Sequence, residues 1–157
     1  MRATSLAPGK PLEIRGEPTP IQEARRLLHR AARLPFEAAN PRDWADHFTN
    51  DIVAARRALV DHILQAERVD SDLNEVYACS PRLRPLVERQ TEEHRELLAL
   101  CHDLAEEAMV LESPGLWVMV EFSERTKALE LLVEKHQERR MDLVYESAYR
   151  ELGGEAG

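Results

Sequence analysis

The sequence predicts an all-α protein, an up-down four-helix bundle, and three observations support this fold class. Glycine is scarce, with 6 residues among 157, and aromatic residues make up only 5% of the chain. Both values count against a β-rich fold, which depends on aromatic side chains and glycine-rich turns. Long stretches carry apolar residues at helical spacing, and each begins at a polar residue followed by proline. A chain of this length can bury most of its apolar surface as one domain.

Four polar-proline pairs mark the expected helix starts: Thr19-Pro20, Asn40-Pro41, Ser80-Pro81 and Ser113-Pro114. A hydroxyl or amide side chain there can accept a hydrogen bond from a free amide of the first turn, and proline fits that turn because it has no N–H. Gln22, three residues after Thr19, predicts a reciprocal capping box. The predicted helices span residues 20–34, 41–68, 81–111 and 114–152. Between the second and third, a single short helical turn is expected within residues 70–80.

The predicted domain organisation is simple. Residues 1–18 mix proline, glycine and charge without periodicity, which predicts a flexible N-terminal arm. Residues 19–152 form the bundle domain, and a C-terminal tail, 153–157, follows where Gly153 and Gly154 end the last helix. Helices of about 30 residues are about 45 Å long, so the bundle should be elongated.

Charge and composition exclude several classes of function. A net charge of -8 repels a phosphate backbone, and no basic stripe with interleaved aromatic residues opposes it, so no nucleic-acid partner is expected. No window approaches about 18 uncharged apolar residues, so no membrane partner is expected either. The two cysteines, Cys79 and Cys101, lack CxxC spacing and a third partner, which favours a reducing, cytoplasmic location. Without H-E-x-x-H or a glycine-rich phosphate loop, an enzyme is the less favoured interpretation.

The apolar stripes of the second, third and fourth predicted helices each contain one histidine: His62, His94 and His136. Each continues its stripe at steps of three and four, where a core leucine would normally stand. Burying an imidazole costs about 1–3 kcal/mol for each polar group left without a partner. Three inward histidines at one level could satisfy one another only through a shared ion or water. A shared metal ion and an ordinary hydrogen-bonded core therefore both stay open.

The remaining histidines and the polar face of the last predicted helix are expected to lie at the surface and not to form a metal site. The other three histidines are expected on the surface or at its boundary: His29, His47 and His102. The last predicted helix carries a polar face at steps of four and three: Asp142, Glu146 and Tyr149. Its simpler interpretation is a solvated face, and the alternative is a docking surface or a network that supports the histidines.

The histidine-bearing segments resemble hemerythrin-like (HHE cation-binding) domains. The runs LVDHILQAE and PRLRPLVERQTEEHRELLAL are similar to a helix pair in which a histidine precedes a carboxylate by four or five residues and the next helix carries Glu-His. Here these are His62 with Glu67, and Glu93-His94. The later run LLVEKHQERRMDLVYESAY resembles the last helix of the family, with His136 as its histidine. The similarity covers about residues 55–150 and implies a metal site of His62, Glu67, His94 and His136.

The family pattern implies a pair of iron atoms, bridged by two carboxylates and held by about five histidines, that carries or senses dioxygen and related small molecules. This chain departs from that pattern. Arg140 and Met141 stand four and five residues after His136, where a second bridging carboxylate would be, and Leu98 stands where the family often has another histidine. We therefore expect one ion, with Glu67 or water completing a shell of three histidines. Iron is implied by the resemblance, and the donors fit zinc or manganese equally.

Two functions follow from the sequence. The first is a hemerythrin-like metal-binding bundle that binds or senses a small, dioxygen-type ligand, and its metal should be lost below about pH 6, where an ordinary histidine takes up a proton. The second is a metal-free helical module that kept the fold, lost the di-iron site and works by docking or oligomerisation. A homo-oligomer is one form that this second function could take.

Overall fold

The computed structural model describes residues 16–36 and 39–153, and within these ranges the chain contains helices and no strand. The α-helices follow in the order α1 (Pro20–Ala32), α2 (Pro41–Ala66), α3 (Asp72–Cys79), α4 (Arg84–Met109) and α5 (Leu116–Gly153). A 3-10 helix, η1 (Pro81–Leu83), leads into α4. The all-α prediction is confirmed. Most of the predicted arm and tail, residues 1–15 and 154–157, lies outside the described residues.

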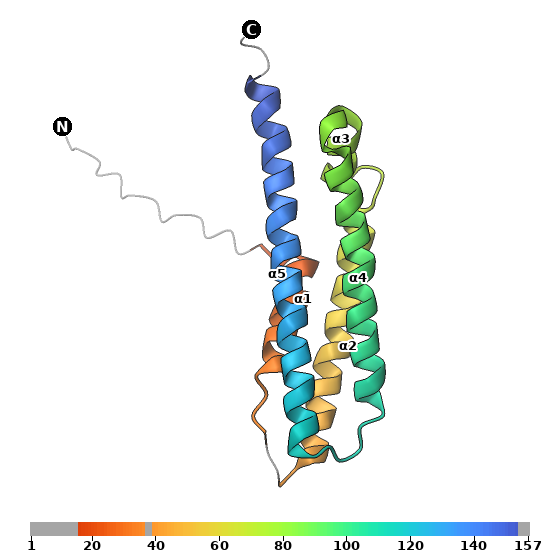
Figure 1. Ribbon diagram of the computed structural model, residues 1–157, viewed down its shortest axis with the longest axis vertical. Coiled ribbons are helices and arrows are strands. Elements are labelled where there is room, and N and C mark those ends of the chain that lie inside the picture. The colour runs from red at the N-terminus through yellow and green to blue at the C-terminus, as the bar shows by residue number, and fades with distance from the viewer. Residues whose placement is uncertain (1–15, 37–38, 154–157) are drawn as a thin grey trace, which may run out of the picture.

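The helices pack as a bundle (Figure 1). Helix α1 contacts α2 and α5, and α4 contacts the same two helices from the other side. With 13 residues α1 is about 20 Å long, whereas the 38 residues of α5 span about 57 Å, so α1 accompanies only part of α5. Helix α3 packs against α4 and α5 near the end of the bundle where α5 finishes. The two ends of the bundle are therefore built from different sets of helices.

The helix starts agree with the sequence to within a few residues. The capping box at Thr19 is confirmed: its Oγ1 accepts a hydrogen bond from the Gln22 amide at 3.4 Å, and Gln22 Oε1 accepts one from the Thr19 amide at 3.0 Å. Asn40 precedes α2 as predicted but makes no side-chain cap bond. The start predicted at residue 114 is wrong by two residues, because α5 begins at Leu116. The predicted helix ends at residues 34 and 68 are each two residues late.

Replacing Thr19 by alanine should destabilise the protein by about 1 kcal/mol, because one amide of the first turn of α1 loses its acceptor. Asn40→Ala is the matched control: Asn40 also precedes a helix, but its side chain caps nothing. Chemical denaturation of the two variants measures the difference. Equal losses would show that the hydroxyl does not stabilise α1.

The segment between α2 and η1 forms more than the single turn that the sequence predicts. Helix α3 has eight residues, and the Ser71 side chain accepts a hydrogen bond from the Asn74 amide at 3.3 Å at its start. A helix this short is not stable alone in water, because nucleation is costly. It holds its shape because Leu73 and Val76, on one face, are buried against the neighbouring helices. Because this stabilisation comes from tertiary contacts, the local sequence pattern predicts a shorter helical segment than the one observed.

The core consists of two apolar clusters along the bundle. The large cluster joins α1, α2, α4 and α5 around the fully buried Phe48, whose ring stacks on Trp44 at 4.8 Å and meets Phe122 edge-on at 5.6 Å. The small cluster lies at the α3 end and comprises Ala66, Leu73, Val76, Leu83, Val87 and Leu143. Between the clusters, α2, α4 and α5 contribute buried polar residues instead of aliphatic ones.

Ion pairs fasten α1 to the rest of the bundle. The buried Glu130 of α5 accepts a hydrogen bond from Arg33 Nη1 at 2.8 Å and contacts His29 Nδ1 at 2.7 Å. Arg30 donates to Asp51 of α2 through Nε at 2.9 Å. His29 is mostly exposed despite its contact, and His47 and His102 are exposed as well. The prediction that these three histidines lie at the surface is confirmed.

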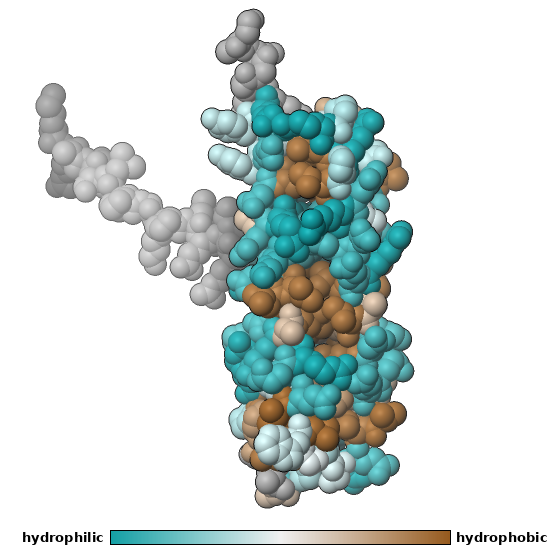
Figure 2. All heavy atoms as spheres, in the orientation of Figure 1, coloured by the Kyte–Doolittle hydropathy of each residue, from teal (hydrophilic) through white to brown (hydrophobic). Residues whose placement is uncertain are grey.

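The outer surface of the bundle is mixed in character. On the face that α4 and α5 form, hydrophobic patches are separated by hydrophilic bands (Figure 2). No helix in the described ranges combines the length and the apolar character that a membrane crossing requires. The polar face around Glu146 is of the solvated kind: Asp142 and Tyr149 are exposed, and Glu146 pairs with Arg82 of η1 at 3.1 Å.

Candidate metal centre

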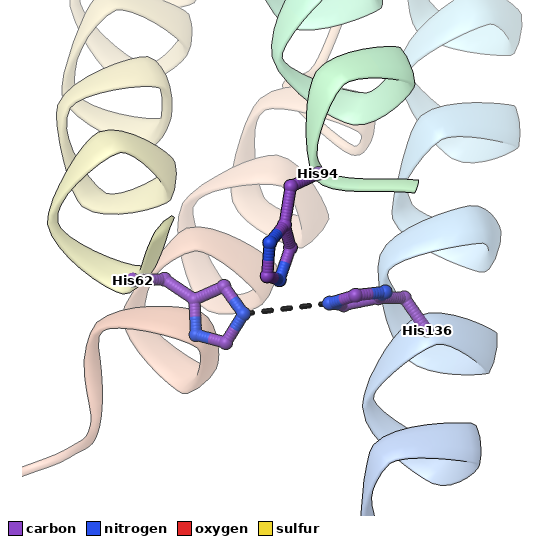
Figure 3. Close-up of side chains that lie close together, drawn as sticks. All are labelled: His62, His94 and His136. Carbon is purple, nitrogen blue, oxygen red and sulfur yellow. Dashed lines mark hydrogen bonds between the residues drawn. The ribbon is translucent and has the colours of Figure 1, made fainter. Parts of the chain in front are cut away.

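Three histidines from three helices point toward one another in the layer between the two apolar clusters (Figure 3). They are His62 of α2, His94 of α4 and His136 of α5, with exposed fractions of 4%, 1% and 0%. Their ring centroids are 5.1, 5.6 and 4.7 Å apart for the pairs 62–94, 62–136 and 94–136. The prediction that these residues are buried and meet at one level is confirmed. We call them the histidine layer.

The spacing of the ring nitrogens is close to that of a metal shell. His62 Nε2 lies 3.4 Å from His136 Nε2. Two nitrogens bound to one tetrahedral ion at ~2.0–2.1 Å lie about 3.4 Å apart. The Nε2 atoms of His62 and His136 are therefore already as far apart as two ligands of one such ion. One ring nitrogen from each of the three residues can be chosen so that all lie within 4.8 Å of one another. The histidine layer could therefore hold a metal ion.

His94 has one nitrogen satisfied and one orphaned. Its Nδ1 contacts Glu67 Oε1 at 3.1 Å. Its Nε2 is buried and has no hydrogen-bond partner among the described residues. Leaving such a group unpaired costs about 1–3 kcal/mol, which a metal ion at the lone pair would remove. The orphaned nitrogen is therefore an observation of this chain that fits a metal.

His136 is held by the carboxylate of Glu93, which is itself paired with Arg139. Glu93 Oε2 accepts from His136 Nδ1 at 2.9 Å, and Arg139 donates to both oxygens of Glu93, at 2.8 and 3.0 Å. Burial alone would raise the pKa of Glu93, but the hydrogen bonds from Arg139 and His136 outweigh it and lower that pKa. A carboxylate kept charged in this position places the proton of His136 on Nδ1. The Nε2 lone pair then faces the other two histidines, as in metal-ligating histidines with a carboxylate behind them.

Glu67, the oxygen ligand expected from the sequence, stands at the edge of the site. It caps the end of α2, and 40% of its side chain is exposed. The contact that it makes is with Nδ1 of His94, across the ring from the orphaned Nε2. Within the described ranges, the group whose ligand atoms converge consists of the three histidines. Glu67 thus holds His94 in the way that Glu93 holds His136.

Burial keeps the three imidazoles neutral. It lowers the pKa of His62 to about 3, with smaller contributions from the charges of His94, His136 and Arg140. The pKa values of His94 and His136 are also lowered, chiefly by burial, against the opposing effects of Glu67 and Glu93. A neutral imidazole has a free lone pair, which is the form that binds a metal. Near neutral pH the histidine layer therefore offers donors without first releasing protons.

The residues that support the layer were not recognised from sequence as its partners. In the sequence Glu93 stands out only as half of a Glu-His pair, and its contact with His136 joins positions 43 residues apart. One signal was present: Glu93 stands three residues after the buried Gln90, which places a glutamate beside an inward stripe. Arg139 gave no comparable signal.

No protein-family model, curated protein or solved structure matches the chain.

Proposed function

We propose that this chain binds one divalent transition-metal ion through His62, His94 and His136, as a hemerythrin-like bundle with a mononuclear site. The observation that carries the proposal is the convergence of three buried imidazoles, one of which has an orphaned Nε2. The carboxylates behind His94 and His136 support it, since metal-ligating histidines are usually oriented in this way. A core that needed only hydrophobic contact would hold leucine at these positions.

The donor count favours one ion over two. A bridged pair of metals needs carboxylates shared between them, but Glu67 and Glu93, which contact the layer, do so at the Nδ1 atoms of His94 and His136. Arg140 adds a positive charge close enough to lower the pKa values of His62 and His94. That charge already opposes one cation at the layer, and a second cation would be repelled by the first ion as well.

Three nitrogen donors leave at least one coordination position for a small ligand. Closed structural sites commonly use four protein ligands, whereas sites that bind small molecules keep a position open. When bound, the ion would supply a Lewis-acidic centre at that position. The resemblance to hemerythrin-like domains favours iron and binding or sensing of a diatomic ligand, whereas the 3.4 Å nitrogen spacing suits tetrahedral zinc.

The test is the metal stoichiometry of the chain purified without an affinity tag. Metal-free protein would be incubated separately with Zn(II), Mn(II) and, without oxygen, Fe(II), then passed through a desalting column and analysed for metal. We expect one ion per chain for at least one metal. Two ions would contradict the mononuclear site. No ion with any metal would overturn metal binding and leave the metal-free interaction module.

Glu93→Gln should weaken metal binding by about 10- to 100-fold, because a neutral amide accepts from His136 Nδ1 less strongly than a carboxylate does and no longer pairs with the charge of Arg139. Glu92→Gln is the control, since Glu92 is the exposed neighbour on the same helix. Competition with a chromophoric chelator measures both affinities. Equal affinities in the two variants would show that Glu93 does not support the site.

A further inference from the structure

A cavity of about 680 Å³ opens beside the histidine layer. It lies where α1 begins and borders the end of α2, the start of α3 and the second half of α5. One wall is His62 itself, and apolar side chains form much of the rest, among them Ile21, Met141 and Val144. The cavity arises because α1 starts partway along the bundle and covers only part of α5. A volume of this size suits a small organic molecule.

Arg140 places a positive charge in the wall of this cavity. Its Nη2 donates to Asp72 at 3.0 Å, while its Nε is buried and has no hydrogen-bond partner within the described part of the chain. The side chain as a whole is only partly covered, with 26% of it exposed, and it lines the cavity, so a ligand can approach its accessible part. A carboxylate is the acceptor whose geometry suits a guanidinium best. His62 and Arg140 border the same cavity, so an anion at Arg140 would also lie beside the histidine layer.

We propose that this cavity binds an amphipathic monocarboxylate, such as a medium-chain fatty acid. The carboxylate lies against Arg140 beside His62, and the hydrocarbon chain lies along Ile21, Met141 and Val144. The inference rests on the proposed metal site for a second positive charge beside the carboxylate. The first positive charge, that of Arg140, is present whether or not a metal is bound. Asp72, which pairs with Arg140 and also borders the cavity, repels any anion there, and it repels a multiply charged anion such as phosphate more than a monocarboxylate.

The test is calorimetric titration of the full chain with three probes, with and without one equivalent of Zn(II). Octanoate carries both features, 1-octanol has the hydrocarbon chain without the charge, and acetate has the charge without the chain. We expect octanoate to bind about 10-fold or more tightly than either of the others, because charge-assisted hydrogen bonds add to apolar burial. Zn(II) should tighten octanoate binding and leave 1-octanol binding unchanged.

Two variants identify the site. Arg140→Met keeps an unbranched, flexible side chain but removes the charge, so in metal-free protein the preference for octanoate over 1-octanol should disappear. Val144→Trp fills the cavity and should weaken both probes. Arg150→Met, ten residues further along α5 and exposed, is the matched control and should bind as the parent does. Circular dichroism of each variant checks that the bundle is intact.

The outcomes separate this inference from the metal proposal. If the chain binds no metal but prefers octanoate in an Arg140-dependent manner, the cavity site stands and the metal proposal falls. If the chain binds metal but takes octanoate and 1-octanol equally, or neither, the cavity inference is overturned and the metal proposal stands. A preference for octanoate that survives Arg140→Met in metal-free protein overturns the inference as well.

Discussion

His94→Ala should reduce bound metal to near zero and remove the stabilisation that added metal gives. The substitution deletes one of three nitrogen donors and leaves two, fewer than stable protein sites for divalent ions use. Metal bound only to the folded state stabilises the parent protein by about 2.7 kcal/mol at a free concentration 100 times the dissociation constant. That increment should vanish in the variant. Thermal unfolding with and without metal, together with elemental analysis, measures both effects.

His102→Ala is the control for this variant, because His102 lies on the same helix but is exposed. It should keep the metal content and the metal-dependent stabilisation of the parent chain. In metal-free protein, His94→Ala also removes the orphaned Nε2, so part of the cost of the cavity that it creates is offset. A variant that still binds metal as the parent does would show that His94 is not a ligand.

The stability of the metal-free protein should fall as the pH drops below about 6.5. The unfolded chain takes up a proton on His62 near that pH, whereas the folded chain keeps His62 neutral down to about pH 3. Between these values the unfolded state binds more protons, so acid favours unfolding. His62 alone should cost up to about 1.4 kcal/mol per pH unit, or about 1.7 kcal/mol between pH 6.5 and 5. The lowered pKa values of His94 and His136 act in the same direction.

Denaturant unfolding at several pH values between 6.5 and 5 tests this dependence above the range in which carboxylates titrate. His62→Leu should reduce the slope of the unfolding free energy with pH by the equivalent of up to one proton taken up on unfolding. His102→Ala should leave that slope unchanged. A flat profile in the parent chain would contradict the buried, neutral state of the histidine layer. The same lowered pKa values move the expected release of metal below the pH of about 6 that an exposed histidine would give.

The three inward histidines could be recognised from the sequence because helical periodicity is a local property. Steps of three and four place His62, His94 and His136 on the same faces as the surrounding leucines, whatever the helices pack against. The burial of those faces then follows from the need to remove apolar surface from water. The capping box at Thr19 is local in the same way, since both of its hydrogen bonds join residues three apart.

The partners of the histidines could not be predicted, because they depend on how helices are offset and rotated against one another. Glu67 meets His94 across 27 residues, and Glu93 meets His136 across 43. A shift of one helical turn, about 5.4 Å, would break both contacts while leaving every apolar stripe intact. The sequence placed Glu67 near His62 because it is close in the chain, whereas the observed contact is with the neighbouring helix.

The sequence by itself determined that the chain is helical, where most helices begin and which three histidines turn inward, since each of these depends on residues within a few turns. Only the tertiary structure decided that α3 is a helix, which ring nitrogen each supporting carboxylate contacts, and that Arg140 and His62 border one cavity. The cavity depends on the level along α5 at which the short α1 begins. The relative offset of helices is set by packing and ion pairs between distant residues, and no local pattern encodes it.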